Sequence, residues 1–142
     1  MTKPFVSLED VLGKDSEALD QAALGEFETT RLGVVPFSSI DHDEFKRAKK
    51  DATIKNPDGS RETDEDKVML NVIVTAVDKD KRSNFTFADK RLLEKLGVVT
   101  ATAAVTKLLN PGEIYNFAVA IQEASGFGEK AQKEREEAVK NS

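Results

Sequence analysis

The chain has 142 residues, of which 39% are hydrophobic and 33% charged, and it carries a formal net charge of -5 with no cysteine. This length predicts one domain that buries about 68% of the surface of the unfolded chain. The absence of cysteine excludes disulfide scaffolds, thiolate zinc sites and cysteine nucleophiles, and the acidic balance disfavours nucleic acid and anionic membranes as partners.

The first 25 residues predict two short helices. Ser7 caps the first, which Gly13 ends, and Asp15 caps the second, which Gly25 ends. The pattern then changes: the segment from Phe27 to Phe37 is rich in threonine and valine, which favours extended structure. We therefore predict one or two strands in this segment, with Gly33 as a candidate bulge.

A capping signature begins the next helix. Asp41 is the cap, Glu44 stands three residues later, and the helix is expected to run to about Ala52. The sequence Asn56-Pro57-Asp58-Gly59 then predicts a turn, because proline supplies a fixed φ and glycine a positive one. The turn either forms the tip of a small hairpin or belongs to a mobile loop.

The longest apolar segment runs from Val68 to Val77 and follows Thr63 and three acidic residues. Its β-branched residues would suit a buried strand, but its apolar residues also recur with helical spacing. The acidic start complements a helix dipole, so we predict a central core helix with Thr63 as its cap.

Two further helices are expected before residue 110. The first covers Ala88 to Leu96 and ends at Gly97, and the second is capped by Thr100 and reaches Leu108.

The segment from Leu108 to Phe127 specifies a complete helix from both ends. Asn110 is a good N-cap, Pro111 suits the first helical position, and Glu113 can return a capping bond. Gly126 supplies the left-handed residue that ends the helix. One apolar stripe recurs at helical spacing between the caps and consists of Ile114, Phe117, Ala118 and Ile121.

The fold class that follows is mainly α: a single compact helical domain over residues 1–128, with a small N-terminal β element. Residues 129–142 are dense in charge and poor in apolar side chains. We predict that they form a charged, partly disordered tail, because so little apolar surface does not offset the entropy of ordering.

No set of residues predicts catalysis, a cofactor or a metal site. His42, the single histidine, lies among acidic residues in the first turn of a helix, where negative charge is favoured and where consecutive side chains point in different directions. We therefore expect a protein that is not an enzyme. The N-terminus becomes acidic before a signal-peptide apolar region can form, and no apolar run approaches the roughly 20 residues that cross a bilayer.

Two surfaces are candidates for binding. The basic cluster from Phe45 to Lys50 could contact phosphates, but it follows an acidic first turn on the same helix, which favours a solvated face. Tyr115, Val119 and Phe127 lie off the main apolar stripe of their helix. They are either core residues of a small bundle or a second stripe that faces a partner helix.

The sequences of three segments resemble a known family. The residues L-L-N-P-G-E-I-Y-N-F-A-V-A-I-Q-E-A-S-G-F, from Leu108 to Phe127, look like the C-terminal part of the small tail assembly chaperones of long-tailed phages and phage-like elements, the XkdN-like group. Arg31 to Lys50 resembles that group's strand followed by a helix with an acidic start. Lys67 to Val77 is similar to its central helix.

This resemblance implies a phage tail assembly chaperone. Such a protein binds the tape measure protein, keeps its long hydrophobic helices soluble, recruits tail tube subunits and leaves before the tail is finished. The resemblance further implies action in the cytoplasm of the bacterial host and absence from the mature virion. The alternative from the residues is a small regulatory or adaptor protein of a mobile element that binds nucleic acid through Phe45 to Lys50.

Overall fold

The structure is a computed structural model that describes residues 5–19, 21–127, 136, 137 and 139. The described chain is mainly α-helical, as predicted, and it contains two antiparallel sheets of two strands each. In chain order the elements are α1 (Leu8–Leu12), α2 (Ser16–Leu19), β1 (Leu24–Thr29), β2 (Gly33–Ser38), α3 (His42–Asp51), β3 (Thr53–Lys55), β4 (Arg61–Thr63), α4 (Glu65–Lys79), α5 (Lys90–Leu96), α6 (Ala101–Leu108) and α7 (Pro111–Ala124).

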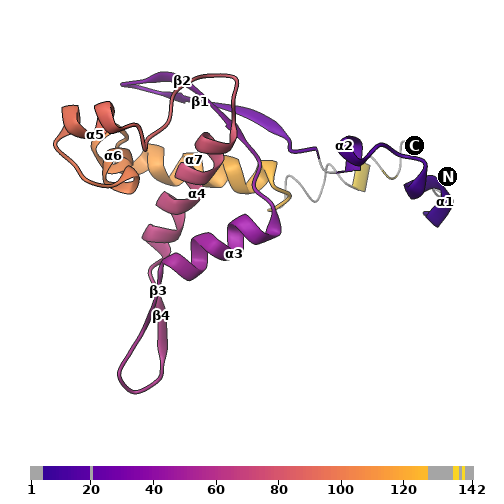
Figure 1. Ribbon diagram of the computed structural model, residues 1–142, viewed down its shortest axis with the longest axis horizontal. Helices are drawn as coiled ribbons and strands as arrows, with labels where there is room; N and C mark the ends of the chain where they lie inside the picture. Colours follow the sequence, from indigo (N-terminus) through magenta and orange to yellow (C-terminus); the bar gives the residue numbers. More distant parts are fainter. Residues whose placement is uncertain (1–4, 20, 128–135, 138, 140–142) are drawn as a thin grey trace.

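Helix α4 occupies the centre of the fold (Figure 1) and confirms the choice of helix over strand for residues 68–77. It packs against α3, α6, α7 and β2, and its Val72 and Ile73 are completely buried. The predicted cap is one residue early. Asp64 caps α4 by accepting from the backbone N–H of Lys67, because Thr63 pairs with Thr53 in the β3–β4 hairpin.

The segment 27–37 forms a hairpin of two strands, β1 and β2. Its register runs without interruption from Thr29 opposite Gly33 to Leu24 opposite Ser38. The prediction that Gly33 forms a bulge is therefore wrong. Gly33 has a φ of 79° and begins β2 directly after the turn, where a left-handed backbone favours glycine.

The second predicted helix is shorter than expected, because the chain enters the hairpin before Gly25. Helix α2 ends at Leu19 and β1 begins at Leu24, so Gly25 is a strand residue and not a helix end. It lies opposite Phe37 in the register. A Cβ atom at position 25 would lie 2.3 Å from the Cζ atom of Phe37, so the ring packs directly on the glycine backbone.

Helix α7 covers one face of this hairpin through aromatic rings. The ring of Phe117 stacks on that of Phe27 with centroids 4.5 Å apart and meets Phe37 at 5.5 Å. Phe117 and Ile121 are completely buried, and Ala118 is 1% exposed. The predicted apolar stripe of α7 therefore forms core contacts with both the hairpin and α4.

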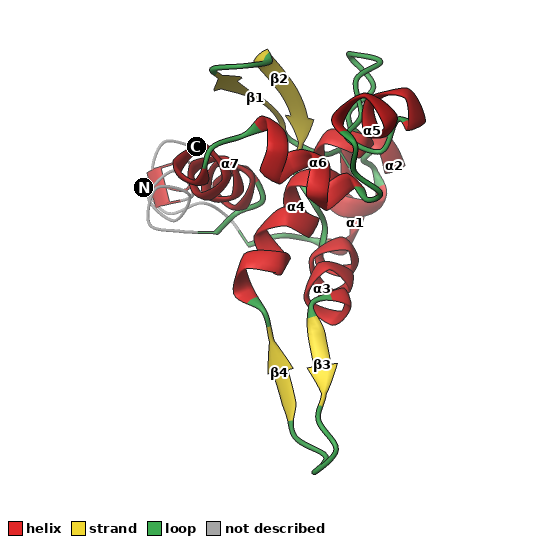
Figure 2. Cartoon of the chain, turned by 90° about the vertical axis from the view of Figure 1, so that its left-hand side faces the viewer, coloured by secondary structure: helices red, strands yellow, loops and turns green. Residues whose placement is uncertain are grey.

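Helix α3 packs against α4, and the second hairpin, which follows α3, projects from the body (Figure 2). The predicted capping box of α3 is present: Asp41 accepts from the N–H of Glu44, and the Glu44 carboxylate accepts from the N–H of Asp41. The turn at residues 56–59 is the tip of the β3–β4 hairpin, with Gly59 at a φ of 92°. The hairpin alternative is thus the correct one.

The remaining helices begin and end close to the predicted residues. Asp89 caps α5 by accepting from the N–H of Arg91, so α5 begins two residues after the predicted Ala88, and Gly97 ends it with a φ of 69°. Thr100 caps α6 and Asn110 caps α7, as predicted.

The predicted boundary between a domain of residues 1–128 and a tail of residues 129–142 lies largely outside the described residues. In the part of the chain that the structure describes, every helix is too short or too polar to cross a membrane.

Candidate partner-binding surface

The three residues predicted to face a partner lie along α7 and just beyond it. Tyr115 is 60% exposed and Phe127 is 47% exposed, while Val119 is half-buried. Tyr115 is therefore not a core residue. Tyr115 and Val119 lie one helical turn apart, whereas Ala124, where α7 ends, is about 13 Å further along the axis than Tyr115. The three side chains are therefore spread along α7 and beyond its end rather than gathered in one cluster, and we call these three residues the strip.

The far end of the strip is held against α3. The ring of Phe127 packs on that of Phe45, with centroids 5.2 Å apart, and the ammonium of Lys49 lies 5.9 Å from the Phe45 centroid. Phe127 therefore combines an intramolecular contact with an exposed ring face, which suits a residue at the margin of an interface.

The backbone that follows α7 fixes the position of Phe127. Gly126 has a φ of 98°, its N–H donates to the carbonyl of Glu123, and the N–H of Phe127 donates to that of Gln122. These two bonds form a Schellman motif. The hydroxyl of Ser125 also accepts from the N–H of Ile40, which ties this end of α7 to the start of α3.

The other end of α7 is tied to the first hairpin by Glu113. One carboxylate oxygen accepts from the N–H of Asn110 at 2.9 Å, which completes the predicted capping box, and the other accepts from the N–H of Thr30 at 2.8 Å. These backbone hydrogen bonds, from Asn110 first and Thr30 second, lower the pKa of Glu113. Because both ends of α7 are anchored, Tyr115 and Val119 are presented on a fixed helix.

An ion pair between the buried carboxylate of Asp80 and the partly exposed Arg82, which the sequence did not predict, anchors the first hairpin to the end of α4. The Asp80 side chain is 1% exposed and accepts from Arg82 Nη2 at 2.8 Å and from the hydroxyl of Ser38 at 3.2 Å. Arg82 also donates to the carbonyls of Gly25 and Phe37. The hydrogen bonds from the Arg82 side chain are the main cause of the lowered pKa of Asp80.

A repeated tripeptide in the sequence could have indicated this pair. Asp-Lys-Arg occurs at residues 80–82 and again at 89–91. In both copies the aspartate accepts from the backbone N–H and the guanidinium of the arginine two residues later. The repeat therefore predicts a local turn, but only the fold buries the first copy.

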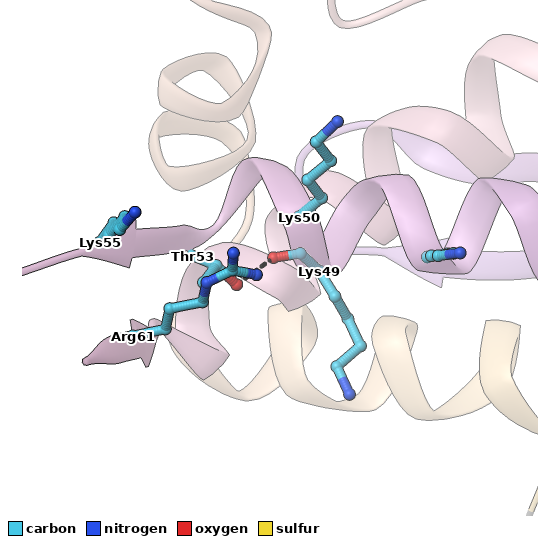
Figure 3. A pocket seen from close by; sticks show the side chains of 6 residues that line it. Lys49, Lys50, Thr53, Lys55 and Arg61 are labelled. Atoms are coloured by element: carbon cyan, nitrogen blue, oxygen red, sulfur yellow. Dashed lines mark hydrogen bonds between the residues drawn. The ribbon is translucent and has the colours of Figure 1, made fainter. Parts of the chain in front are cut away.

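The basic cluster of α3 extends beyond the residues that the sequence brought together. A pocket of about 590 Å³ lies where α3 meets the second hairpin, and it is lined by Lys46, Lys49, Lys50, Thr53, Lys55 and Arg61 (Figure 3). Sequence reasoning found the three lysines of α3. It missed Lys55 and Arg61, because only the β3–β4 pairing places them beside the helix.

His42 is exposed in the first turn of α3. Among residues 5–19, 21–127, 136, 137 and 139, His, Cys, Asp and Glu side chains do not gather in a group of three or more that could hold a metal ion.

Comparisons with known proteins assign the chain to a family. Residues 8–140 match the model of a family described as phage XkdN-like tail assembly chaperone protein. The fold is similar to a crystal structure described as the protein yqbn, with a TM-score of 0.60, 19% sequence identity, and coverage of 89% of this chain and 100% of that one. A comparison with curated proteins found no match.

Proposed function

The chain belongs to the XkdN-like tail assembly chaperone family of phages, and from this premise we propose that it binds the tape measure protein and tail tube subunits while the tail is built. It acts without catalysis in the cytoplasm of the bacterial host and is not retained in the mature virion. Its task is to cover apolar helical surface on the client until the tube subunits take its place.

The observation that supports this proposal most directly is the strip of Tyr115, Val119 and Phe127. Aromatic residues are enriched in protein interfaces, and a large exposed aromatic on a fixed helix is typical of a contact that forms with another helix. The strip is narrow, so the interface it makes is modest in area and can be reversed. A chaperone that must leave its client needs this property.

Co-expression tests the proposal. The tape measure protein from the same genome is expressed alone and together with this chain, and its soluble yield and co-purification are measured. We expect the soluble yield to rise and a complex to co-purify, because a bound chaperone covers apolar helix faces that otherwise associate. If neither the tape measure protein nor the tube protein is solubilised or co-purified, the proposal is wrong.

Substitution of the strip tests the site separately from the function. Tyr115→Ala with Val119→Ala should weaken the complex, and circular dichroism should show that the double variant remains folded. Ile54→Ala is the matched control, because Ile54 is 64% exposed but lies on β3 of the second hairpin, which projects away from α7 (Figure 2). A folded double variant that binds as well as the wild type would show that the strip is not the binding site.

A further inference from the structure

The pocket between α3 and the second hairpin concentrates positive charge without compensation. Five of its six lining residues are cationic. Lys55 lies directly opposite Arg61 in the hairpin register, and Lys46 and Lys50 lie one turn apart on α3. Like charges in either arrangement repel and destabilise the free protein.

These cations have no carboxylate partner within the described chain. The ion pairs found there involve Lys79, Arg82 and Arg91 instead. Lys49 lies over the Phe45 ring, which attracts the ammonium but supplies no negative charge to neutralise it. An anionic partner would relieve the repulsion, and the long alkyl stems of lysine and arginine offer apolar surface beside the charges. The pocket therefore fits a ligand that is both acidic and apolar.

A segment of this chain has that combination of properties. Residues 5–19, which we name the N-terminal arm, contain four acidic residues and one lysine. The arm also carries exposed apolar side chains, which are Phe5, Val6, Leu8, Leu12 and Leu19. Five exposed apolar side chains on one short segment are a candidate contact surface for a protein partner.

The arrangement within α1 suits insertion into a pocket. Leu8 and Leu12 lie one turn apart on α1, and Glu9 and Asp10 lie between them in sequence, on other faces of the helix. One face of α1 is therefore apolar, and acidic side chains flank it. We propose that the N-terminal arm of one copy of this chain docks in the basic pocket of a second copy.

The position of the arm favours a second copy over its own pocket. The chain leaves the body at Ala23, whose N–H donates to the hydroxyl of Ser39 and whose carbonyl accepts from the N–H of Ser39. From there α2 and α1 extend away from the body, on a different side from the β3–β4 hairpin (Figure 1).

The contact joins the arm of one copy to the pocket of another. Two copies that exchange arms form a closed dimer, and copies that do not exchange arms associate into a ring or an open chain. Salt weakens the association, because the charges of both partners are exposed to solvent.

Two full-length variants test the proposal. The arm variant, Leu8→Asp with Leu12→Asp, changes exposed residues outside the core, and the pocket variant, Lys55→Glu with Arg61→Glu, changes exposed residues of the second hairpin. The matched control is Lys90→Glu with Lys95→Glu, which makes the same change of charge on α5. Sedimentation velocity at low salt measures the mass over a range of concentrations.

We expect the wild type and the control to exceed the chain mass of 15.6 kDa as concentration rises, and each test variant to remain at it. A mixture of the two variants should form a species of twice the chain mass and nothing larger. The arm of the pocket variant and the pocket of the arm variant are the only intact pair, so association stops at two copies.

Other outcomes overturn the proposal. A wild type that stays monomeric, or a mixture that stays monomeric, would show that arm and pocket do not meet between copies. An equal loss of self-association in the control variant would show that the change in net charge, and not the pocket, causes the effect. Salt-sensitive retention of duplex DNA that only the pocket variant loses, together with a monomeric wild type, would assign the pocket to nucleic acid.

Discussion

Gly25→Ala is expected to destabilise the protein through one aromatic ring. The added Cβ atom would lie 2.3 Å from Cζ of Phe37 and 2.8 Å from both Cε atoms. The ring has little room to retreat, because Phe37 is 3% exposed and packs on Phe117. The substitution therefore forces either the ring or strand β1 to move.

The magnitude follows from two opposing effects. Overpacking a filled site costs about 1–3 kcal/mol, whereas replacing glycine by alanine lowers the entropy of the unfolded chain and returns about 0.4–1 kcal/mol. We expect a net loss of about 1–2 kcal/mol in the free energy of unfolding, measured by urea denaturation followed by circular dichroism.

Two further variants isolate the cause. Gly112→Ala is the matched control, because its Cβ atom would meet only Oδ1 of Asn110 at an ordinary 3.5 Å, so it should be neutral or slightly stabilising. Phe37→Leu removes the outer ring atoms, and in that background Gly25→Ala should cost far less. The same loss with and without the Phe37 ring would refute the explanation, since the two sites would then not be coupled.

Three other predictions concern a helix cap, the ion pair of Asp80 and Arg82, and the charged C-terminal segment. Asn110→Ala should lower the free energy of unfolding by about 1 kcal/mol, and an unchanged urea midpoint would show that its cap is dispensable. Arg82→Ala should lower the urea midpoint much more than Arg91→Ala, because only the former leaves a buried carboxylate, that of Asp80, without its guanidinium. The pKa of Asp80 is lowered in the folded state, so the stabilisation by Arg82 is complete above the ordinary pKa of an aspartate and is lost as the pH falls through the lowered pKa. The difference in urea midpoint between the wild type and Arg82→Ala should therefore become smaller in acid. Deletion of residues 130–142 should leave the thermal midpoint nearly unchanged, and a large drop would show that the tail docks on the body.

Helix boundaries that depend on local chemistry were predicted well from the sequence. Asn110, Asp41 and Thr100 each cap a helix where expected, because a cap needs only its own side chain and the next three residues. Gly25 shows the limit of this reasoning. Its role is set by Phe37, twelve residues away, so a residue that resembles a helix end is a strand residue.

The candidate surfaces divide in the same way. Helical spacing alone placed Tyr115 and Val119 off the core stripe of α7, and the 60% exposure of Tyr115 agrees with that placement. The pocket could be predicted only in part. Lys46 to Lys50 are close in sequence, but Arg61 joins them only through the pairing of β3 and β4. The sequence did not decide between a hairpin and a mobile loop at residues 56–59, so it did not predict this pairing.

The carboxylate of Glu113 has a consequence for how the protein opens. Because it accepts from the backbone N–H groups of both Asn110 and Thr30, the start of α7 cannot fray without also releasing the tip of the first hairpin. The two amides, 80 residues apart in the chain by their numbers, should exchange hydrogen with deuterium at linked rates as one opening unit. A single side chain thus makes two distant segments behave as one cooperative region.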